Sequence, residues 1–206
     1  MEHYGTMELI SEQYLKDVSH CDKIIDLFEH ADEYGGTYRG VHGVGSKMNS
    51  MYHVKESQDC APGDVFSDSF YYPPPQDIVD TYYSVINEVD DMLYYWMRET
   101  LGKEITENRL LKWENLPQIQ KYPEAGGFKS WHSDGASCMK MLRRQFVFIL
   151  YLNTVPDGGT EFFYQKKYVE AVKGKVLMFP AQWMFKHRGE VSFTSNKYIL
   201  TGWWKL

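Results

Sequence analysis

Two histidines and one aspartate in the C-terminal half of the chain have the types and spacing of a metal site. His132 and Asp134 stand two positions apart in the stretch WHSD. On a β-strand, residues two apart point to the same side, so this spacing predicts an imidazole and a carboxylate that project together. A second histidine, His187, follows a later predicted strand, where a barrel would bring it beside the pair. Two histidines and one carboxylate form the facial triad that binds non-haem Fe(II) and leaves coordination positions open.

A lysine on the last predicted strand adds a second chemical signal. Lys197, Ile199, Thr201 and Trp203 alternate along this strand and would share one of its faces. An ammonium among inward-facing apolar side chains needs an anionic partner, because burying an isolated charge is costly. The pattern therefore indicates that an anion lies beside Lys197.

The same residues also fit other classes of protein. A His-x-Asp pair occurs by chance in many proteins as a hydrogen-bonded couple without a metal. A zinc hydrolase also uses two histidines and a carboxylate, but it has no evident use for Lys197. A non-catalytic binding domain with a structural metal has no need of a buried ammonium either.

Two helices are predicted in the first half of the chain. Ser19 has the type of an N-cap residue and precedes apolar side chains at helical spacing. A second, longer helix is predicted after the prolines 73–75 and before Gly102. The apolar positions of the first face are Cys21, Ile24, Ile25 and Phe28, and those of the second are Ile78, Tyr82, Ile86, Val89, Leu93 and Trp96.

Short strands dominate the second half. Runs of β-branched and aromatic residues separated by turn signals predict strands there, and Gly158 and Gly159 predict a tight turn into one of them. Shorter β-like runs stand at 38–44 and 51–54. Two helices followed by many strands indicate an α+β protein whose strands form a sandwich or barrel. The predicted strand segments are 117–122, 143–153, 158–164, 173–180 and 196–206.

Composition limits the class of protein further. The chain has 206 residues and a formal net charge of -6, without a block of basic residues, which disfavours nucleic acid binding. Its three cysteines, Cys21, Cys60 and Cys138, form no Cys-x-x-Cys pair, so a reducing, cytoplasmic setting is expected. No apolar run long enough for a membrane helix is present. We expect one domain over 1–206, with a helical and loop flank containing some strands over 1–109 and a core with the metal site over 110–206.

Five segments of the C-terminal half carry a family resemblance. They are, in order, YPEAGGFKSWHSD, FILYLN, GGTEFF, KGKVLMFPAQWMFKHRGE and KYILTGWW. Together, over roughly Gln118 to Trp204, they resemble the Fe(II)/2-oxoglutarate dioxygenases of the prolyl 4-hydroxylase type. The resemblance implies a double-stranded β-helix (jelly-roll) core with flanking N-terminal helices, in which His132, Asp134 and His187 hold the iron.

The resemblance also implies a cosubstrate site. Lys197 matches the basic residue that pairs with the distal carboxylate of 2-oxoglutarate, and as a lysine it acts there as a point charge. Tyr122 and Tyr151 match two tyrosines that contact the cosubstrate, and the hydroxyl of Thr201 would share the distal carboxylate with Lys197. The implied cofactors are Fe(II), 2-oxoglutarate and O2, with room for ascorbate.

The implied activity is hydroxylation of an aliphatic C–H bond, on a peptidyl substrate of prolyl type. A small molecule or free amino acid is the alternative substrate with the same cofactors, and a non-catalytic jelly-roll binding domain is the alternative outside enzymes. Neither nucleic acid nor a membrane is expected as a partner. Residues 32–70 are the predicted region of substrate specificity, and Arg188 faces either the substrate or solvent. The oligomeric state does not follow from the sequence.

Overall fold

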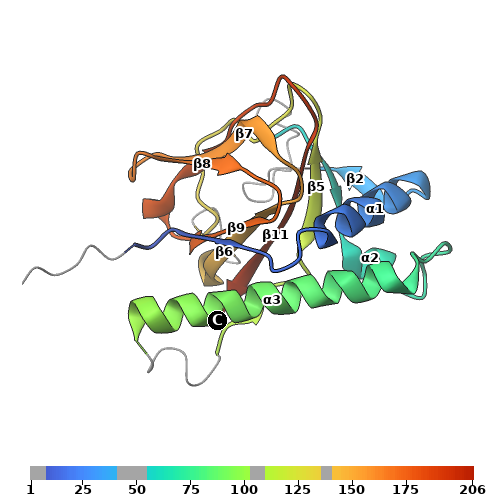
Figure 1. Cartoon of the computed structure of the whole chain (residues 1–206), viewed down its shortest axis with the longest axis horizontal. Helices are drawn as coiled ribbons and strands as arrows, with labels where there is room; N and C mark the ends of the chain where they lie inside the picture. The colour runs from blue at the N-terminus through green and yellow to red at the C-terminus, as the bar shows by residue number, and fades with distance from the viewer. Residues whose placement is uncertain (1–7, 41–54, 103–109, 136–140) are drawn as a thin grey trace, which may run out of the picture.

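Two antiparallel sheets face each other, and helices cover the outer face of the larger one (Figure 1). The computed structural model describes residues 8–40, 55–102, 110–135 and 141–206. The helices are α1 (His20–Glu33), α2 (Pro62–Val65) and α3 (Gln76–Leu101), with 3-10 turns η1 (Met141–Arg143) and η2 (Trp183–Phe185). In spatial order, the large sheet contains β1 (Ser11–Tyr14), β9 (Lys175–Pro180), β6 (Arg144–Tyr151), β11 (Lys197–Lys205), β5 (Gln118–Tyr122), β3 (Gln58–Cys60) and β2 (Thr37–Arg39). The short strand β4 (Lys112–Trp113) also pairs with β11. The small sheet contains, in spatial order, β10 (His187–Gly189), β7 (Val155–Phe162) and β8 (Lys167–Ala171).

Alternation along the central strands separates two apolar cores. On β6, Phe148 and Leu150 belong to the core shared with the helices. Val147, Ile149 and Tyr151 point the other way, into the space between the two sheets. Because side chains on a strand alternate between its faces, one sequence run supplies both cores. The α+β architecture expected from the sequence is confirmed.

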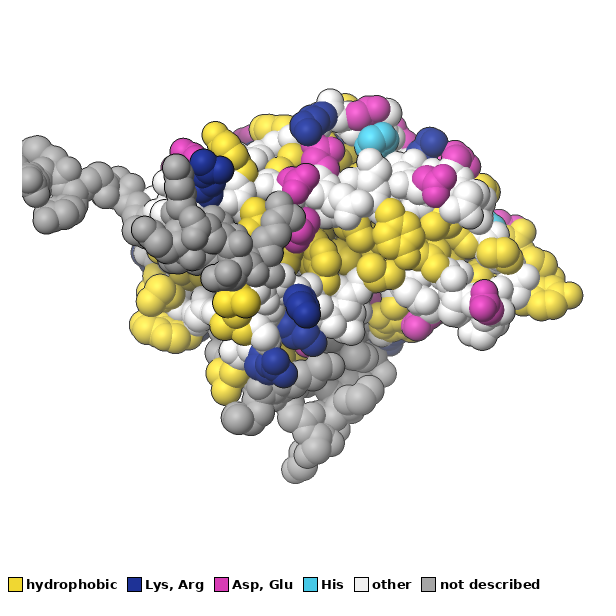
Figure 2. All heavy atoms as spheres, turned by 90° about the horizontal axis from the view of Figure 1, so that it is seen from below, with side chains coloured by type: hydrophobic (Ala, Val, Ile, Leu, Met, Phe, Trp, Pro, Cys, Tyr) yellow, Lys and Arg dark blue, Asp and Glu magenta, His cyan; other side chains and the backbone are white. Residues whose placement is uncertain are grey.

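The long helix α3 is the prediction that the structure reproduces most closely. It begins after Pro75 and ends at Leu101, and Gly102 follows with φ of 94°, a conformation that suits glycine. Its predicted apolar positions are buried, apart from the partly buried Ile78. On the outer side of α3, Tyr83 and Tyr95 stay 40% and 65% exposed. The face of the molecule seen from below carries a band of apolar side chains with acidic side chains beside it (Figure 2).

Removing a buried side chain from α3 is expected to destabilise the whole fold. Leu93 is completely buried between helix and sheet. The substitution Leu93→Ala should lower the free energy of unfolding by about 2–5 kcal/mol, because it leaves a cavity as well as losing apolar contacts. Urea unfolding measures this loss. Tyr95→Ala on the outer side of the helix should change the free energy of unfolding by only about 0.5 kcal/mol, and an equal loss for both variants would contradict the assigned helix face.

The predicted N-cap of the first helix, Ser19, is correct in position but makes no capping bond with its side chain. Ser19 has helical backbone angles, and its hydroxyl does not cap α1. Instead, the Ser19 hydroxyl and amide both donate to the Asp17 carboxylate, at 2.6 and 2.9 Å. Asp17 thereby satisfies an amide at this helix start. The predicted helix itself is present, and Ile25, expected on the buried face, is only partly buried.

The predicted tight turn at Gly158 and Gly159 is also wrong. Both glycines lie inside β7, where the pairing with β8 is irregular between Val155 and Thr160. A Cβ on Gly159 would lie 2.3 Å from the carbonyl oxygen of Val169, so a glycine is needed for close approach of the two strands rather than for a turn. Of the β-like runs in the flank, 38–44 overlaps β2 only in part, and 51–54 lies outside the described residues.

Within the part of the chain that the structure describes, no helix combines the length and the apolar character needed to cross a membrane.

Candidate metal and cosubstrate site

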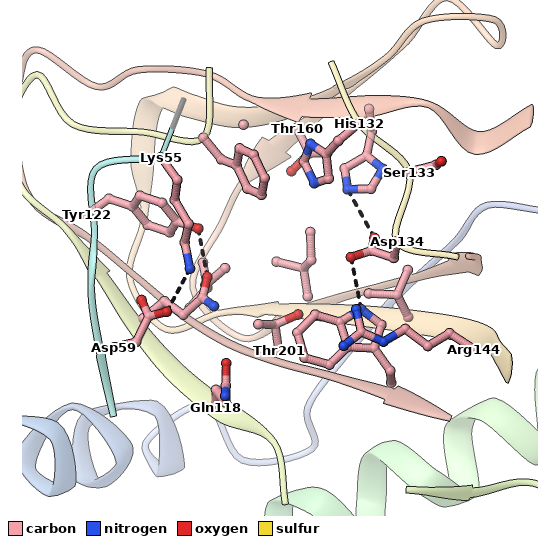
Figure 3. A pocket seen from close by; sticks show the side chains of 18 of the residues that line it. Lys55, Asp59, Gln118, Tyr122, His132, Ser133, Asp134, Arg144, Thr160 and Thr201 are labelled. Atoms are coloured by element: carbon pink, nitrogen blue, oxygen red, sulfur yellow. Dashed lines mark hydrogen bonds and ion pairs between the residues drawn. The ribbon is translucent and has the colours of Figure 1, made fainter. Parts of the chain in front are cut away.

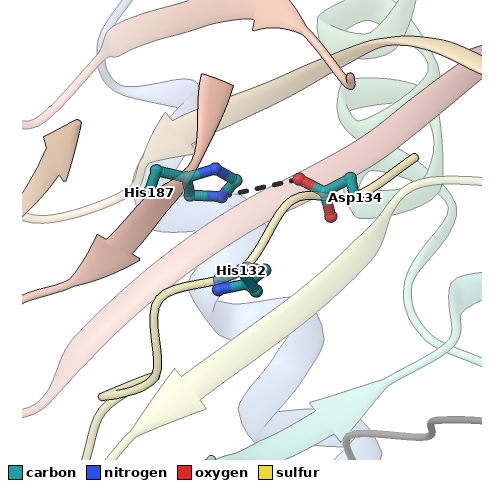
Figure 4. Close-up of side chains that lie close together, drawn as sticks. All are labelled: His132, Asp134 and His187. Carbon is teal, nitrogen blue, oxygen red and sulfur yellow. Dashed lines mark ion pairs between the residues drawn. The ribbon is translucent and has the colours of Figure 1, made fainter. Parts of the chain in front are cut away.

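The two histidines meet through a backbone bridge rather than a regular strand. His132 and His187 form an isolated antiparallel bridge in which each N–H donates to the carbonyl of the other, at 3.0 and 2.8 Å. Asp134 follows in a turn, so the expected strand through His132 and Asp134 is wrong, although both side chains still project to one place. The reason is that the segment pairs with β10 only at His132, as an isolated bridge, and Asp134 already lies in the following turn. Figure 4 shows the three side chains converging from the two segments.

The three side chains offer ligand atoms that all lie within 4.8 Å of one another. The Nδ1 atoms of His132 and His187 each lie 2.9 Å from a backbone carbonyl oxygen, those of Ser130 and Phe185. Since a carbonyl only accepts hydrogen bonds, these contacts place the proton of a neutral imidazole on Nδ1 and the lone pair on Nε2. Both rings are thus oriented as metal-binding histidines usually are.

The Asp134 carboxylate has one oxygen that the described residues leave without a hydrogen bond. Its Oδ2 is buried and lies 3.5 Å from Nε2 of His187. Burial raises the pKa of Asp134, but the charges of His187, His132 and Arg144 outweigh burial and hold that pKa below its ordinary value. A buried anionic oxygen beside two imidazoles is the environment that a divalent cation would complete, so the donor set fits Fe(II).

A cavity of about 590 Å³ opens beside these three side chains, between the two sheets. Figure 3 shows Asp134 and Arg144 on one side of it, and Lys55, Asp59 and Tyr122 on the other. All seven residues that the sequence nominated for metal or cosubstrate binding line this cavity: Tyr122, His132, Asp134, Tyr151, His187, Lys197 and Thr201.

Lys197 is a buried cation in the cavity wall. It is 4% exposed, and its Nζ donates to the carbonyl oxygens of Gly158 and Glu190 at 2.7 and 3.0 Å. No carboxylate of the described residues lies within ion-pair distance of it. Burial lowers the pKa of Lys197 to about 8, although the charges of Glu190 and Asp157 raise it. An anion in the cavity would supply the partner that this ammonium lacks.

The three hydroxyl groups nominated with Lys197 have protein partners. Tyr122 stands directly opposite Lys197 in the β5–β11 pairing, and its hydroxyl donates to Gln120 Oε1 at 2.7 Å. Tyr151 donates to Thr160 Oγ1 at 2.7 Å. Thr201 donates its hydroxyl proton to the carbonyl of Phe148, on the neighbouring strand β6, at 2.7 Å. Burial raises the pKa of both tyrosines, so they are neutral hydrogen-bond donors at ordinary pH.

Several cavity residues were missed by sequence reasoning. Lys55 and Asp59 form a buried ion pair of 2.7 Å, with side chains 6% and 5% exposed. The Trp203 indole donates to Asp134 Oδ1 at 2.9 Å, a contact absent from the sequence analysis, which placed Trp203 only on the inward face. The alternation along β11 could have predicted that Trp203 lines the cavity, whereas no local sequence pattern predicted this for Lys55 or Asp59.

Arg188, whose direction the sequence left open, points away from the cavity. Its guanidinium donates to Glu161 Oε2 at 2.8 and 3.0 Å and lies over the Trp131 ring, 4.6 Å from its centre. Glu161 and Arg188 are directly paired on neighbouring strands of the small sheet, facing outward. Neither residue lines the cavity.

The comparison with known sequences identifies a family for the C-terminal half. Residues 117–205 match the model of the 2OG-Fe(II) oxygenase superfamily. This range contains all three side chains of the His-Asp-His cluster and the four cosubstrate candidates. No curated protein sequence matches the chain.

Solved structures of similar shape confirm the fold. A viral collagen prolyl hydroxylase from Paramecium Bursaria Chlorella virus-1 has 15% identity and a TM-score of 0.62, covering 96% of both chains. A prolyl-4-hydroxylase from Pseudomonas putida has 17% identity and a TM-score of 0.65, covering 96% of this chain and 93% of that one. A prolyl hydroxylase from Trichoplax adhaerens, in complex with a peptide fragment of the hypoxia inducible factor oxygen degradation domain, has 15% identity and a TM-score of 0.68, covering 96% and 83%. The predicted jelly-roll core with flanking helices is therefore correct.

Proposed function

We propose that this chain hydroxylates an aliphatic C–H bond of a peptidyl, prolyl-type substrate. It is a 2-oxoglutarate-dependent non-haem iron dioxygenase, and its residues 117–205 match the model of the 2OG-Fe(II) oxygenase superfamily. The observation that carries the site assignment is the convergence of His132, Asp134 and His187 at the edge of a cavity that also contains the unpaired ammonium of Lys197. A divalent cation and a dianion would satisfy these two groups together.

The three clustered side chains are the proposed iron ligands. When bound, Fe(II) and 2-oxoglutarate supply, with O2, the oxidation that converts C–H to C–OH while 2-oxoglutarate becomes succinate and CO2. The chain's contribution is to hold both imidazoles in one tautomer through the carbonyls of Ser130 and Phe185, and to present one carboxylate oxygen to the same point.

Lys197 is the proposed anchor of the distal carboxylate of 2-oxoglutarate. Its ammonium lies in the cavity wall, where two backbone carbonyls accept its hydrogen bonds and no carboxylate of the described residues lies within ion-pair distance. Tyr122, opposite it in the sheet, would turn its hydroxyl from Gln120 toward the cosubstrate. Tyr151 would donate in the same way from β6, on the other side of β11, and Thr201 would donate to the same carboxylate by turning its hydroxyl from the Phe148 carbonyl.

Apolar side chains keep water away from the proposed reaction centre. Val147, Ile149 and Ile199 line the cavity beside the cosubstrate candidates. The Phe128 ring is stacked on the His132 imidazole, with 3.7 Å between ring centres and 12° between planes. A dry wall favours transfer of the oxygen atom to the substrate over loss of the oxidant to solvent.

The proposed substrate class is supported by the fold and by the polar side of the cavity. The fold is shared with prolyl hydroxylases, one of which was solved with a peptide fragment. In this chain the side of the cavity away from the histidines carries the polar groups of Lys55, Asp59 and Gln118, which suit the amides of a peptide. Residues 32–70 supply two of these groups, in line with the specificity role proposed for that region.

The proposal also includes the domain organisation and the cellular compartment. The helices and the large sheet share one apolar core, so we treat the flank and the core as one domain. Cys21 and Cys60 are buried free thiols, which suits the reducing conditions of the cytoplasm.

A substrate comparison tests the proposal. The full chain is supplied with Fe(II), 2-oxoglutarate, O2 and ascorbate, and with either proline-containing peptides, free proline or other free amino acids. Expected are succinate and a peptide that has gained one oxygen atom, both absent for Asp134→Ala. Turnover of free amino acids alone would overturn the peptidyl assignment, and failure of every mixture to consume 2-oxoglutarate would overturn the enzyme.

A further inference from the structure

The two oxygens of the Asp134 carboxylate have different surroundings. Oδ1 accepts a hydrogen bond from Nε1 of Trp203 at 2.9 Å. Oδ2 has no hydrogen-bond partner among the described residues and lies 3.5 Å from Nε2 of His187. The indole therefore occupies one oxygen and leaves the other facing the histidines.

Among the described residues, no backbone N–H donates to either oxygen of this carboxylate. Asp134 lies in a turn, not on a strand that would limit its direction. The terminal torsion of an aspartate is broad, so its carboxylate rotates unless a partner holds it. Trp203 lies near the end of β11, which is paired on both sides and supplies a rigid support for such a partner.

The Trp203 indole also packs against the cation of an ion pair. The Arg144 guanidinium carbon lies 3.8 Å from the centre of the Trp203 ring. Arg144 Nε donates to Glu114 Oε2 at 2.6 Å, and the Glu114 side chain is 2% exposed. The Glu114 amide in turn donates to the Trp203 carbonyl at 2.9 Å. The four residues Glu114, Arg144, Trp203 and Asp134 form one connected network along the cavity wall.

We propose that Trp203 is a positioning residue for the metal site: its indole N–H fixes Asp134 with Oδ2 directed at the two histidines, while Arg144 and Glu114 hold the plane of the indole. The inference rests on the proposed function, because it takes Asp134 as a ligand. Groups that hydrogen-bond to ligating side chains tune metal affinity by about 10–100-fold. Trp203 thus acts on the metal without touching it.

The neighbouring residue Trp204 offers a matched control. Its Nε1 donates to Asp90 Oδ1 at 2.8 Å, the same kind of bond as that between Trp203 and Asp134. Trp204 lies on the opposite face of β11, in the helix-side core, and is completely buried. Removing this second indole N–H removes an equivalent hydrogen bond at a place remote from the cavity.

The test compares Trp203→Phe and Trp204→Phe by titrating the metal-free proteins with Co(II), using calorimetry without cosubstrate or substrate. Trp203→Phe should bind Co(II) about 10–100-fold more weakly than wild type, while its apo-protein loses no more stability in urea than that of Trp204→Phe. Trp204→Phe should lose some stability and bind Co(II) as wild type does. Equal Co(II) affinity of Trp203→Phe and wild type would overturn the inference.

A second variant tests the Arg144 part of the network. Arg144→Met keeps the indole N–H but removes the cation over its ring and the Glu114 pair. It should weaken Co(II) binding in the same direction as Trp203→Phe, and unchanged affinity would remove Arg144 from the network. If wild type itself does not bind Co(II), the proposed function fails first, which is a different result from a wild type that binds while Trp203→Phe binds equally well.

Discussion

Anaerobic wild-type protein given Fe(II) and 2-oxoglutarate should develop the weak visible metal-to-ligand band of the chelate, and His132→Ala should not. His132 supplies one of three ligand atoms within 4.8 Å of one another, and its Nδ1 bond to Ser130 prepares Nε2 for coordination. Loss of a ligand should exceed the effect of losing a supporting hydrogen bond, so we expect iron affinity to fall by more than about 100-fold. His187→Ala should behave in the same way.

The matched control for this loss is His30→Ala. His30 lies on α1, where its Nε2 contacts the Tyr72 carbonyl at 2.9 Å, and it does not line the cavity. His30→Ala should keep both the band and the iron affinity of wild type. A full-strength band in His132→Ala would show that this histidine is not a ligand. Iron or zinc binding by wild type without any band would favour a zinc enzyme or a binding domain over the dioxygenase.

Lys197→Ala should retain iron but bind 2-oxoglutarate far more weakly. Truncating one partner of a buried charge pair costs about 2–4 kcal/mol, which is a factor of about 30 to 1,000 in Kd. Titration of the chelate band with 2-oxoglutarate measures this factor. Lys121→Ala is the control, because Lys121 lies on the adjacent strand but pairs with Glu29 outside the cavity. An unchanged Kd in Lys197→Ala would remove Lys197 from the cosubstrate site.

The pH dependence of cosubstrate binding follows from the same lysine. Its pKa is lowered to about 8 in the protein without cosubstrate, so the ammonium is present below this pH and is lost as pH rises through it. A carboxylate needs the ammonium, so 2-oxoglutarate should bind about tenfold more weakly at pH 9 than at pH 7. Lys197→Arg, whose guanidinium stays charged, should show a flatter profile over this range. Equal slopes for wild type and Lys197→Arg would assign the titration to another group.

The sequence determined those features that depend on local pattern and residue type. Helical spacing located α3 and its buried face, and β-branched and aromatic runs located the central strands β5, β6, β9 and β11. Residue types in order along the chain nominated His132, Asp134, His187 and Lys197, which the fold brings to one cavity. Strand alternation alone placed Lys197 and Thr201 on the inner face.

Only the tertiary structure decided how distant segments meet. The His132–His187 bridge depends on register between segments far apart in sequence, which no local periodicity encodes. The close approach at Gly159 and the Lys55–Asp59 pair join residues that are near in sequence, but the irregular pairing of β7 with β8 and the burial of both charges arise only in the folded chain. Trp203 reaches Asp134 across 69 positions of sequence. Its inward face was readable from the alternation on β11, but the partner of its indole N–H was fixed only when the turn after His132 folded against that strand.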